Sequence, residues 1–217
     1  MKDNCVLMAE SVTEGHPDKL CDTIADAVLD ACLALDCSAH VACEVMATAG
    51  KIIAAGEITA SRLPDIPAVL CQTVREAGYG GADYEVEVIT HAQSPDIAGV
   101  VGESGELGAG DQGIVYGYAC EETPEFLPLP VVLAHRLTRL LTEARKRNTI
   151  PGIRPDGKAE VAVEYRNGRP KRIAAVVVSC QHEEELELSE LRRAVMRHVM
   201  EPAFRDFPLD DETEILI

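Results

Sequence analysis

The sequence predicts an α+β protein in which helices cover one face of each β-sheet. The first observation is a repeat. Both halves of the chain are expected to run β-α-β-β-α-β, although the amino acids themselves do not visibly repeat. The second is a hairpin signal in each half, Ala49-Gly50-Lys51 and Asn167-Gly168. The third is that the expected helices are apolar on a single face, which must be buried against a sheet.

The first half begins with a long amphipathic helix. Its apolar residues follow helical spacing, namely Leu20, Ile24, Val28, Ala31 and Leu35. Pro64 and Pro67 mark the start of a second helix, because the first helical turn accepts proline. The expected elements are a strand at 5–10, a helix at 17–35, strands at 39–48 and 51–60, a helix at 64–78 and a strand at 84–92.

The second half repeats this order. Asn167-Gly168 predicts a tight hairpin between two strands. Ser189 is a suitable N-cap for a helix whose apolar face contains Leu191, Val195 and Val199. The expected elements are a strand at 114–120, a helix at 128–147, strands at 158–166 and 170–181, a helix at 188–204 and a strand at 212–217.

Composition argues against several functional classes. The net charge of −17 and the absence of tryptophan argue against a nucleic-acid partner. No basic amphipathic segment is present for a membrane surface, and the longest aliphatic run, Ile173–Val178, is too short to span a bilayer. No signal peptide is visible, and the eight cysteines include no Cys-x-x-Cys pair. We therefore expect a cytoplasmic protein with reduced cysteines.

The segment Glu14–Lys19 combines the groups of a phosphate site with the start of a helix. Pro17 and Asp18 are typical of a first helical turn, where unpaired N–H groups favour anions. His16 and Lys19 add further donors, and Asp18 could meet the same phosphates through Mg2+, which takes one or two carboxylates with phosphate oxygens. The alternative is an ordinary capped surface helix.

The segment Gly108–Gly113 matches G-x-G-x-x-G but lacks the context of a dinucleotide site. Such a site needs a strand before the glycines and a helix after them, whereas here a strand is expected to follow. Six glycines between 99 and 113 instead favour a hinged loop that closes over a site. A flexible connector is the alternative.

Three further places carry candidate binding residues. Glu44 and Glu57 are expected near opposite positions of one hairpin, where like charges are unfavourable unless they are exposed or share a cation. Gln93 ends a strand, and its amide can bind a substrate or only cap the loop. In Arg154–Lys158, proline and glycine hold Asp156 and Lys158 at the start of a strand, or form a simple polar turn.

Five ordered motifs give the chain a resemblance to the S-adenosylmethionine synthetase (methionine adenosyltransferase) family. The resemblance extends from about Val6 to Ile217, and family members continue beyond it. The motifs are Ser11–Lys19, Gly56–Thr59, Gln93–Ile97, Gly108–Gly113 and Arg154–Lys158. The resemblance implies that ATP and L-methionine form S-adenosylmethionine and triphosphate, which is then cleaved to phosphate and pyrophosphate.

The resemblance also implies roles for individual residues. His16 and Lys158 would be catalytic, and the triphosphate site would contain His16, Asp111, Asp156, Gly157 and Lys158. Glu57 and Gln93 would bind methionine. Asp18 would hold Mg2+, and Glu44 would lie at a K+ site. The stretch after Gln93 would be a mobile loop that gates the site.

The resemblance further implies an architecture of three such units with exchanged segments, of which this chain supplies two. We expect a first unit at 1–98, a mobile loop at 99–113 and a second unit at 114–217 that stops within its last strand. Subunits of the family pair sheet to sheet and share active sites, which implies a homodimer or higher homo-oligomer. A chain without the family's C-terminal third could instead be a non-catalytic subunit, or half of a split enzyme that binds a complementary C-terminal chain.

Overall fold

A computed structural model describes residues 4–80, 84–94 and 112–217. The chain divides into two units by its contacts. Unit 1 contains Met1–His16 and Tyr118–Ile217, and unit 2 contains Pro17–Gly117. The α+β class is confirmed, because each unit has one sheet with helices packed on it. None of the described helices is long and apolar enough to cross a membrane.

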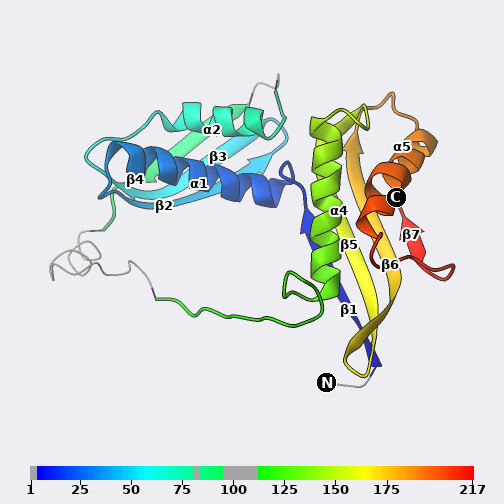
Figure 1. Cartoon of the computed structure of the whole chain (residues 1–217). Helices are drawn as coiled ribbons and strands as arrows, with labels where there is room; N and C mark the ends of the chain where they lie inside the picture. The colour runs from blue at the N-terminus through cyan, green and yellow to red at the C-terminus, as the bar shows by residue number, and fades with distance from the viewer. Residues whose placement is uncertain (1–3, 81–83, 95–111) are drawn as a thin grey trace. The chain divides into compact units, whose positions relative to one another are not determined.

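Unit 2 has a three-stranded sheet in the order β2-β3-β4. Strands β2 (His40–Thr48) and β3 (Lys51–Thr59) form the predicted antiparallel hairpin, and β4 (Glu85–His91) joins β3 in parallel. Helices α1 (Pro17–Leu35) and α2 (Ile66–Glu76) pack together on one face of this sheet (Figure 1). The buried core alternates along β3 and follows helical spacing in α1, as shown by Ile52, Ala54, Ile58, Leu20, Ile24 and Val28.

Unit 1 has a four-stranded sheet in the order β1-β5-β6-β7. Strand β1 (Asn4–Val12) runs antiparallel to β5 (Ile153–Arg166), which pairs in turn with β6 (Arg169–His182). The short β7 (Glu214–Leu216) adds in parallel to β6. Helices α4 (Leu129–Lys146) and α5 (Leu188–Val195) cover one face of this sheet (Figure 1).

The Asn-Gly hairpin forms as predicted between β5 and β6. Asn167 and Gly168 both have positive φ, 52° and 72°, which is the backbone that a type I′ turn requires. The ladder that begins at this turn has two register shifts, between Glu164 and Tyr165 and between Ala162 and Val163. Beyond them Val161 faces Val176 and Ala159 faces Val178. These four side chains belong to the buried core under α4.

The strand predicted at 114–120 is wrong. Residues 114–120 form no strand, and Ile114, Val115 and Tyr116 are 81%, 96% and 92% exposed. Both neighbours of β5 in the sheet are already present, since β1 lies on one side and β6 on the other. The N-terminal strand β1 pairs with β5 in the sheet of the second half, and not with the strands β2 to β4 that follow it in sequence.

The helix predicted at 188–204 is present without a break, but it changes from α-helix to π-helix and back along its length. A π-helical turn, Met196–Met200, separates α5 from the short α6 (Glu201–Ala203). The N–H of Glu201 reaches back to the carbonyl of Met196. Pro202 has no N–H with which to continue the regular pattern, and a wide turn before it accommodates that loss.

The predicted division at residues 98 and 113 stays a prediction. By contact, the chain divides after His16 and after Gly117, so β1 belongs with the second half. Most of the predicted 99–113 loop, including Asp111, lies outside the described residues.

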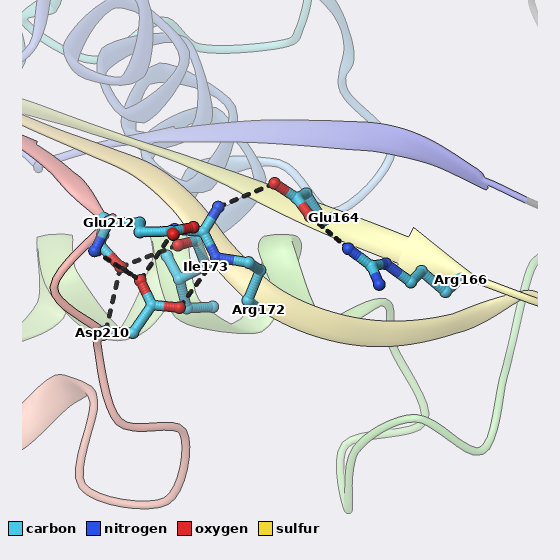
Figure 2. A network of polar contacts seen from close by, with 7 residues as sticks. Glu164, Arg166, Arg172, Ile173, Asp210 and Glu212 are labelled. Atoms are coloured by element: carbon cyan, nitrogen blue, oxygen red, sulfur yellow. Dashed lines mark hydrogen bonds and ion pairs between the residues drawn. The ribbon is translucent and has the colours of Figure 1, made fainter.

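The segment that leads into β7 is held by a network around Arg172 on β6 (Figure 2). Its Nε and Nη2 donate to the two carboxylate oxygens of Asp210, each at 2.8 Å, and Nη1 donates to Glu164 at 2.8 Å. Thr213 donates from its hydroxyl to Asp210 and to the carbonyl of Ile173, each at 2.9 Å. The hydrogen bonds from Arg172, above all, lower the pKa of Asp210 well below its usual range.

This lowered pKa predicts an acid-sensitive contribution to stability. Because the folded state lowers the pKa of Asp210, its contribution is complete above the ordinary aspartate value of about 3.9 and is lost as pH falls through the lower folded value. Asp210→Asn should reduce the free energy of unfolding at pH 7, and the gap from wild type should narrow at about pH 2. Urea unfolding at both pH values measures this gap, with Asp211→Asn as the neighbouring charge control. An equal gap at both pH values would contradict the assignment.

Candidate phosphate and methionine sites

The Ser11–Lys19 and Arg154–Lys158 motifs meet at the end of β1. The β1–β5 ladder places Val12 opposite Lys158. Beyond the ladder, the N–H of Thr13 donates to the carbonyl of Gly157 at 2.9 Å. The Thr13 hydroxyl donates to the carbonyl of Pro155 at 2.7 Å and lies 3.2 Å from that of Gly157. Two motifs far apart in the sequence are therefore joined by buried hydrogen bonds.

Gly15 allows the two motifs to approach this closely. A Cβ atom at this position would lie 2.3 Å from the Cβ of Pro155 and 2.6 Å from its carbonyl carbon. Any larger residue would push the loop away from Pro155, because atoms at that distance overlap. The glycine in the first motif thus packs against the proline in the second.

Lys158 is engaged by carboxylates. Its Nζ lies 2.6 Å from Glu10 and 4.0 Å from Glu160, which face each other across the β1–β5 ladder. The Lys158 side chain is one-third exposed, so an anion can approach it, but must compete with Glu10. Exposed ion pairs of this kind contribute only about 0–1 kcal/mol, so a multiply charged phosphate chain can displace Glu10 from Lys158.

Asp156 and Gly157 occupy the first part of β5, beside β6. The N–H of Asp156 donates to the side-chain oxygen of Gln181 at 3.3 Å, and Gly157 lies opposite Cys180. Burial, followed by the negative charge of Asp156, raises the pKa of the Cys180 thiol to about 11. Cys180 is therefore a neutral packing group beside the motif.

His16 ends the loop that follows β1. Its N–H donates to the carbonyl of Thr13 at 3.1 Å, which closes a tight turn. Ser11, earlier in the motif, bonds through its hydroxyl to His135 Nδ1 at 3.1 Å and to the Thr138 hydroxyl at 2.9 Å. Sequence reasoning gave no role to Thr13 or His135, because nothing local links either residue to its distant partner.

In unit 2, the residues predicted to bind methionine, Glu57 and Gln93, lie on and beside β3. Glu57 Oε1 is 3.6 Å from His91 Nε2 on β4, and the N–H of Gln93 donates to the Thr59 hydroxyl at 3.0 Å. Glu57 and Gln93 are therefore brought to the same end of the β3–β4 pair. Their side chains present a carboxylate and an amide, which suit an ammonium group and a carboxylate respectively.

Glu44 and Glu57 lie near each other on the β2–β3 hairpin, as expected. Glu44 faces Ala55, and Glu57 faces Ala42, so the two carboxylates are diagonal rather than directly opposite. Both lie on the sheet face away from the buried core, where Glu44 is exposed. Water screens their repulsion there, and no cation is needed to explain their proximity.

The metal predictions rest on single carboxylates. Among the described residues, no group of three or more His, Cys, Asp or Glu side chains is placed to hold a metal ion. Asp18 is exposed in the first turn of α1. One exposed carboxylate fits Mg2+ when phosphate oxygens and water complete the shell, which is the usual arrangement for this ion.

Comparison with known proteins identifies the family. The model of the S-adenosylmethionine synthetase N-terminal domain matches residues 4–98, and that of the central domain matches residues 106–217. The chain belongs to the S-adenosylmethionine synthetase family. The predicted resemblance is therefore confirmed.

Relatives within the S-adenosylmethionine synthetase family are similar over nearly the whole chain. S-adenosylmethionine synthases of two Thermus thermophilus strains are 47% identical over 232 residues, covering 98% of this chain. That of Clostridium botulinum (strain Alaska E43 / Type E3) is 45% identical over 227 residues, covering 96%. The chain spans 59% of the Thermus relatives and 58% of the Clostridium relative.

The junction of the two motifs can be tested by stability. Thr13→Val keeps the shape of the side chain but removes the hydroxyl that donates to Pro155 and approaches Gly157. Leaving the buried Pro155 carbonyl unsatisfied should cost about 1–3 kcal/mol in the free energy of unfolding. Thr13→Ser keeps the hydroxyl and serves as the control in urea unfolding. Equal stability of the valine and serine variants would show that the hydroxyl does not join the motifs.

Proposed function

We propose that this chain provides the phosphate-binding and methionine-binding residues of a methionine adenosyltransferase. The observation that carries the proposal is the junction at Thr13, which puts the His16 loop beside the Asp156–Lys158 segment. Family membership supports the same activity. The substrates would be ATP and L-methionine.

The reaction needs charge stabilisation rather than a base. A lone pair of the methionine sulfur forms the S–C5′ bond, and the C5′–O bond breaks with its electrons passing to the triphosphate oxygen. The products are a sulfonium, S-adenosylmethionine, and triphosphate. One water then cleaves triphosphate to phosphate and pyrophosphate. Because a neutral thioether is already nucleophilic, alignment and positive charge at the leaving oxygen would supply the catalysis.

The residues of unit 1 would act on the phosphates. Lys158 would move from Glu10 to the triphosphate, and His16 would donate to the oxygen that gains charge. The backbone at Asp156 and Gly157, held by Thr13 and Gln181, would position the chain of phosphates. Asp111 is proposed for the same site from the resemblance alone.

The residues of unit 2 would bind methionine. Glu57 would accept from the ammonium group, and the Gln93 amide would donate to the carboxylate. Asp18 would hold Mg2+, which supplies positive charge to the phosphates, and Glu44 would contribute an oxygen to K+.

Exposed apolar residues on the strands suit a homodimer or higher homo-oligomer, notably Val6, Met8, Met46 and Ile89.

A second candidate is a subunit that binds a complementary chain or a complete synthetase. The net charge of −17 favours it, because the motifs supply few cations for a phosphate chain and Lys158 already has two carboxylates beside it. S-adenosylmethionine formation should be measured for the chain alone and mixed with the remaining region of the Thermus relative. Activity only in the mixture would favour the split enzyme, and no activity in either would favour the binding subunit.

His16 and Lys158 should act mainly on turnover. In the active assembly, His16→Asn and Lys158→Met should each lower kcat by about 10²–10³-fold, because one preorganised donor to developing charge is worth that much. The KM for methionine should change little. Lys171→Met removes a lysine from β6 outside the proposed site and controls for charge. Turnover near wild type in both site variants would contradict these roles.

Glu57 should act mainly on methionine. Glu57→Gln keeps the size of the side chain but removes the charge that would pair with the ammonium group. The KM for methionine should rise by about tenfold or more, since a hydrogen bond to a charged group is worth about 1.5–3 kcal/mol. The KM for ATP should stay near wild type. A larger effect on ATP than on methionine would reassign the residue.

A further inference from the structure

We propose that Glu14 is a positioning residue for the phosphate site. Its carboxylate, held by Arg145 and Lys146 at the end of α4, would fix the loop that ends at His16. This inference rests on the proposed function, because the loop matters only if His16 acts on phosphates. Neither the motif nor the comparisons give Glu14 a role.

Each oxygen of the Glu14 carboxylate has its own cation. Arg145 Nη2 donates to Oε1, and Lys146 Nζ lies 2.7 Å from Oε2. The Glu14 side chain is 29% exposed and that of Arg145 only 16%, whereas that of Lys146 is 53% exposed. The Arg145 contact is therefore the better shielded of the two and is weakened less by salt.

The contact gives the loop a second support. Thr13 fastens the loop to the start of β5, through Pro155 and Gly157. Glu14 fastens the next residue to a different element, the C-terminal end of α4. Two supports on different elements restrict both the position and the rotation of a loop, whereas one support leaves rotation free.

Helix α4 is a suitable anchor because it belongs to the core. Leu133, Leu137 and Leu141 are almost fully buried against the sheet. Cations in its last turn also interact favourably with the helix dipole. The side chains of Arg145 and Lys146 thus start from a fixed backbone, and Glu14 adopts the position that they define.

A positioning role and a purely electrostatic role predict opposite signs. Glu14→Gln raises the local charge by one unit. If Glu14 acted only through its charge, an anion would bind more tightly to this variant, because a repulsive carboxylate is gone. If Glu14 positions the loop, the loop of the variant is no longer held in place, and an anion binds more weakly in spite of the more favourable charge.

The test compares Glu14→Gln with Asp206→Asn. Asp206 pairs with Arg136 at 3.2 Å, so the control also removes a carboxylate partner from α4 but leaves the His16 loop alone. Amide hydrogen exchange, tripolyphosphate binding by calorimetry and steady-state kinetics of the active assembly are measured for both variants and wild type.

We expect the Thr13 and His16 amides of Glu14→Gln to exchange at least about tenfold faster, while amides of the β5 core stay as in wild type. Tripolyphosphate should bind more weakly, and kcat should fall by about 10–10²-fold with little change in the methionine KM, since small misplacements have effects of this size. Asp206→Asn should match wild type in all three measurements.

Unchanged exchange at Thr13 and His16 would overturn the proposal, as would tighter tripolyphosphate binding with unchanged turnover. If wild type neither binds tripolyphosphate nor turns over, the proposed function fails, and the exchange rates still decide whether Glu14 holds the loop. If Glu14→Gln does not fold, Lys146→Gln keeps the Arg145 contact and should show smaller changes in the same direction. Wild-type exchange in that variant would then count against the proposal.

Discussion

The pairing of β1 with β5 is the constraint on which the candidate phosphate site depends. It runs in register from Asn4 opposite Arg166 to Val12 opposite Lys158. This register brings the Ser11–Lys19 motif next to the Arg154–Lys158 motif. Thr13 lies directly beyond the ladder and is hydrogen-bonded to Gly157. A slip of one residue would turn every side chain of β1 to the other face of the sheet and would separate Glu10 from Lys158.

Charge balance is the second theme of unit 1. The chain is strongly acidic, yet several of its cations at and near the motifs are held by carboxylates: Lys158 by Glu10, and Arg145 and Lys146 by Glu14. The two pairings differ in burial. Lys158 and Glu10 are exposed enough to exchange partners with an anion, whereas Arg145 is largely buried beside Glu14. The first suits a binding group and the second suits a support.

Local sequence signals were reliable where the structure depends on local physics. The helix at 17–35 was predicted at its observed bounds, because Pro17 marks its start and apolar spacing gives most of its buried face; Leu35, which was expected on that face, is exposed. The same reasoning failed at 114–120. Ile114, Val115 and Tyr116 have strand-forming side chains, but whether such a segment forms a strand depends on a partner elsewhere in the chain, and β1 and β6 already flank β5.

By itself, the sequence determined the α+β class, most element positions and the motifs that identify the family, because periodicity, turn residues and motif spacing are written locally. The tertiary structure decided which segments meet. It placed β1 in the sheet of the second half, and it joined Thr13 to Gly157 and Glu14 to the end of α4. Such contacts depend on strand order, register and side-chain reach across more than a hundred residues, and no local pattern encodes them.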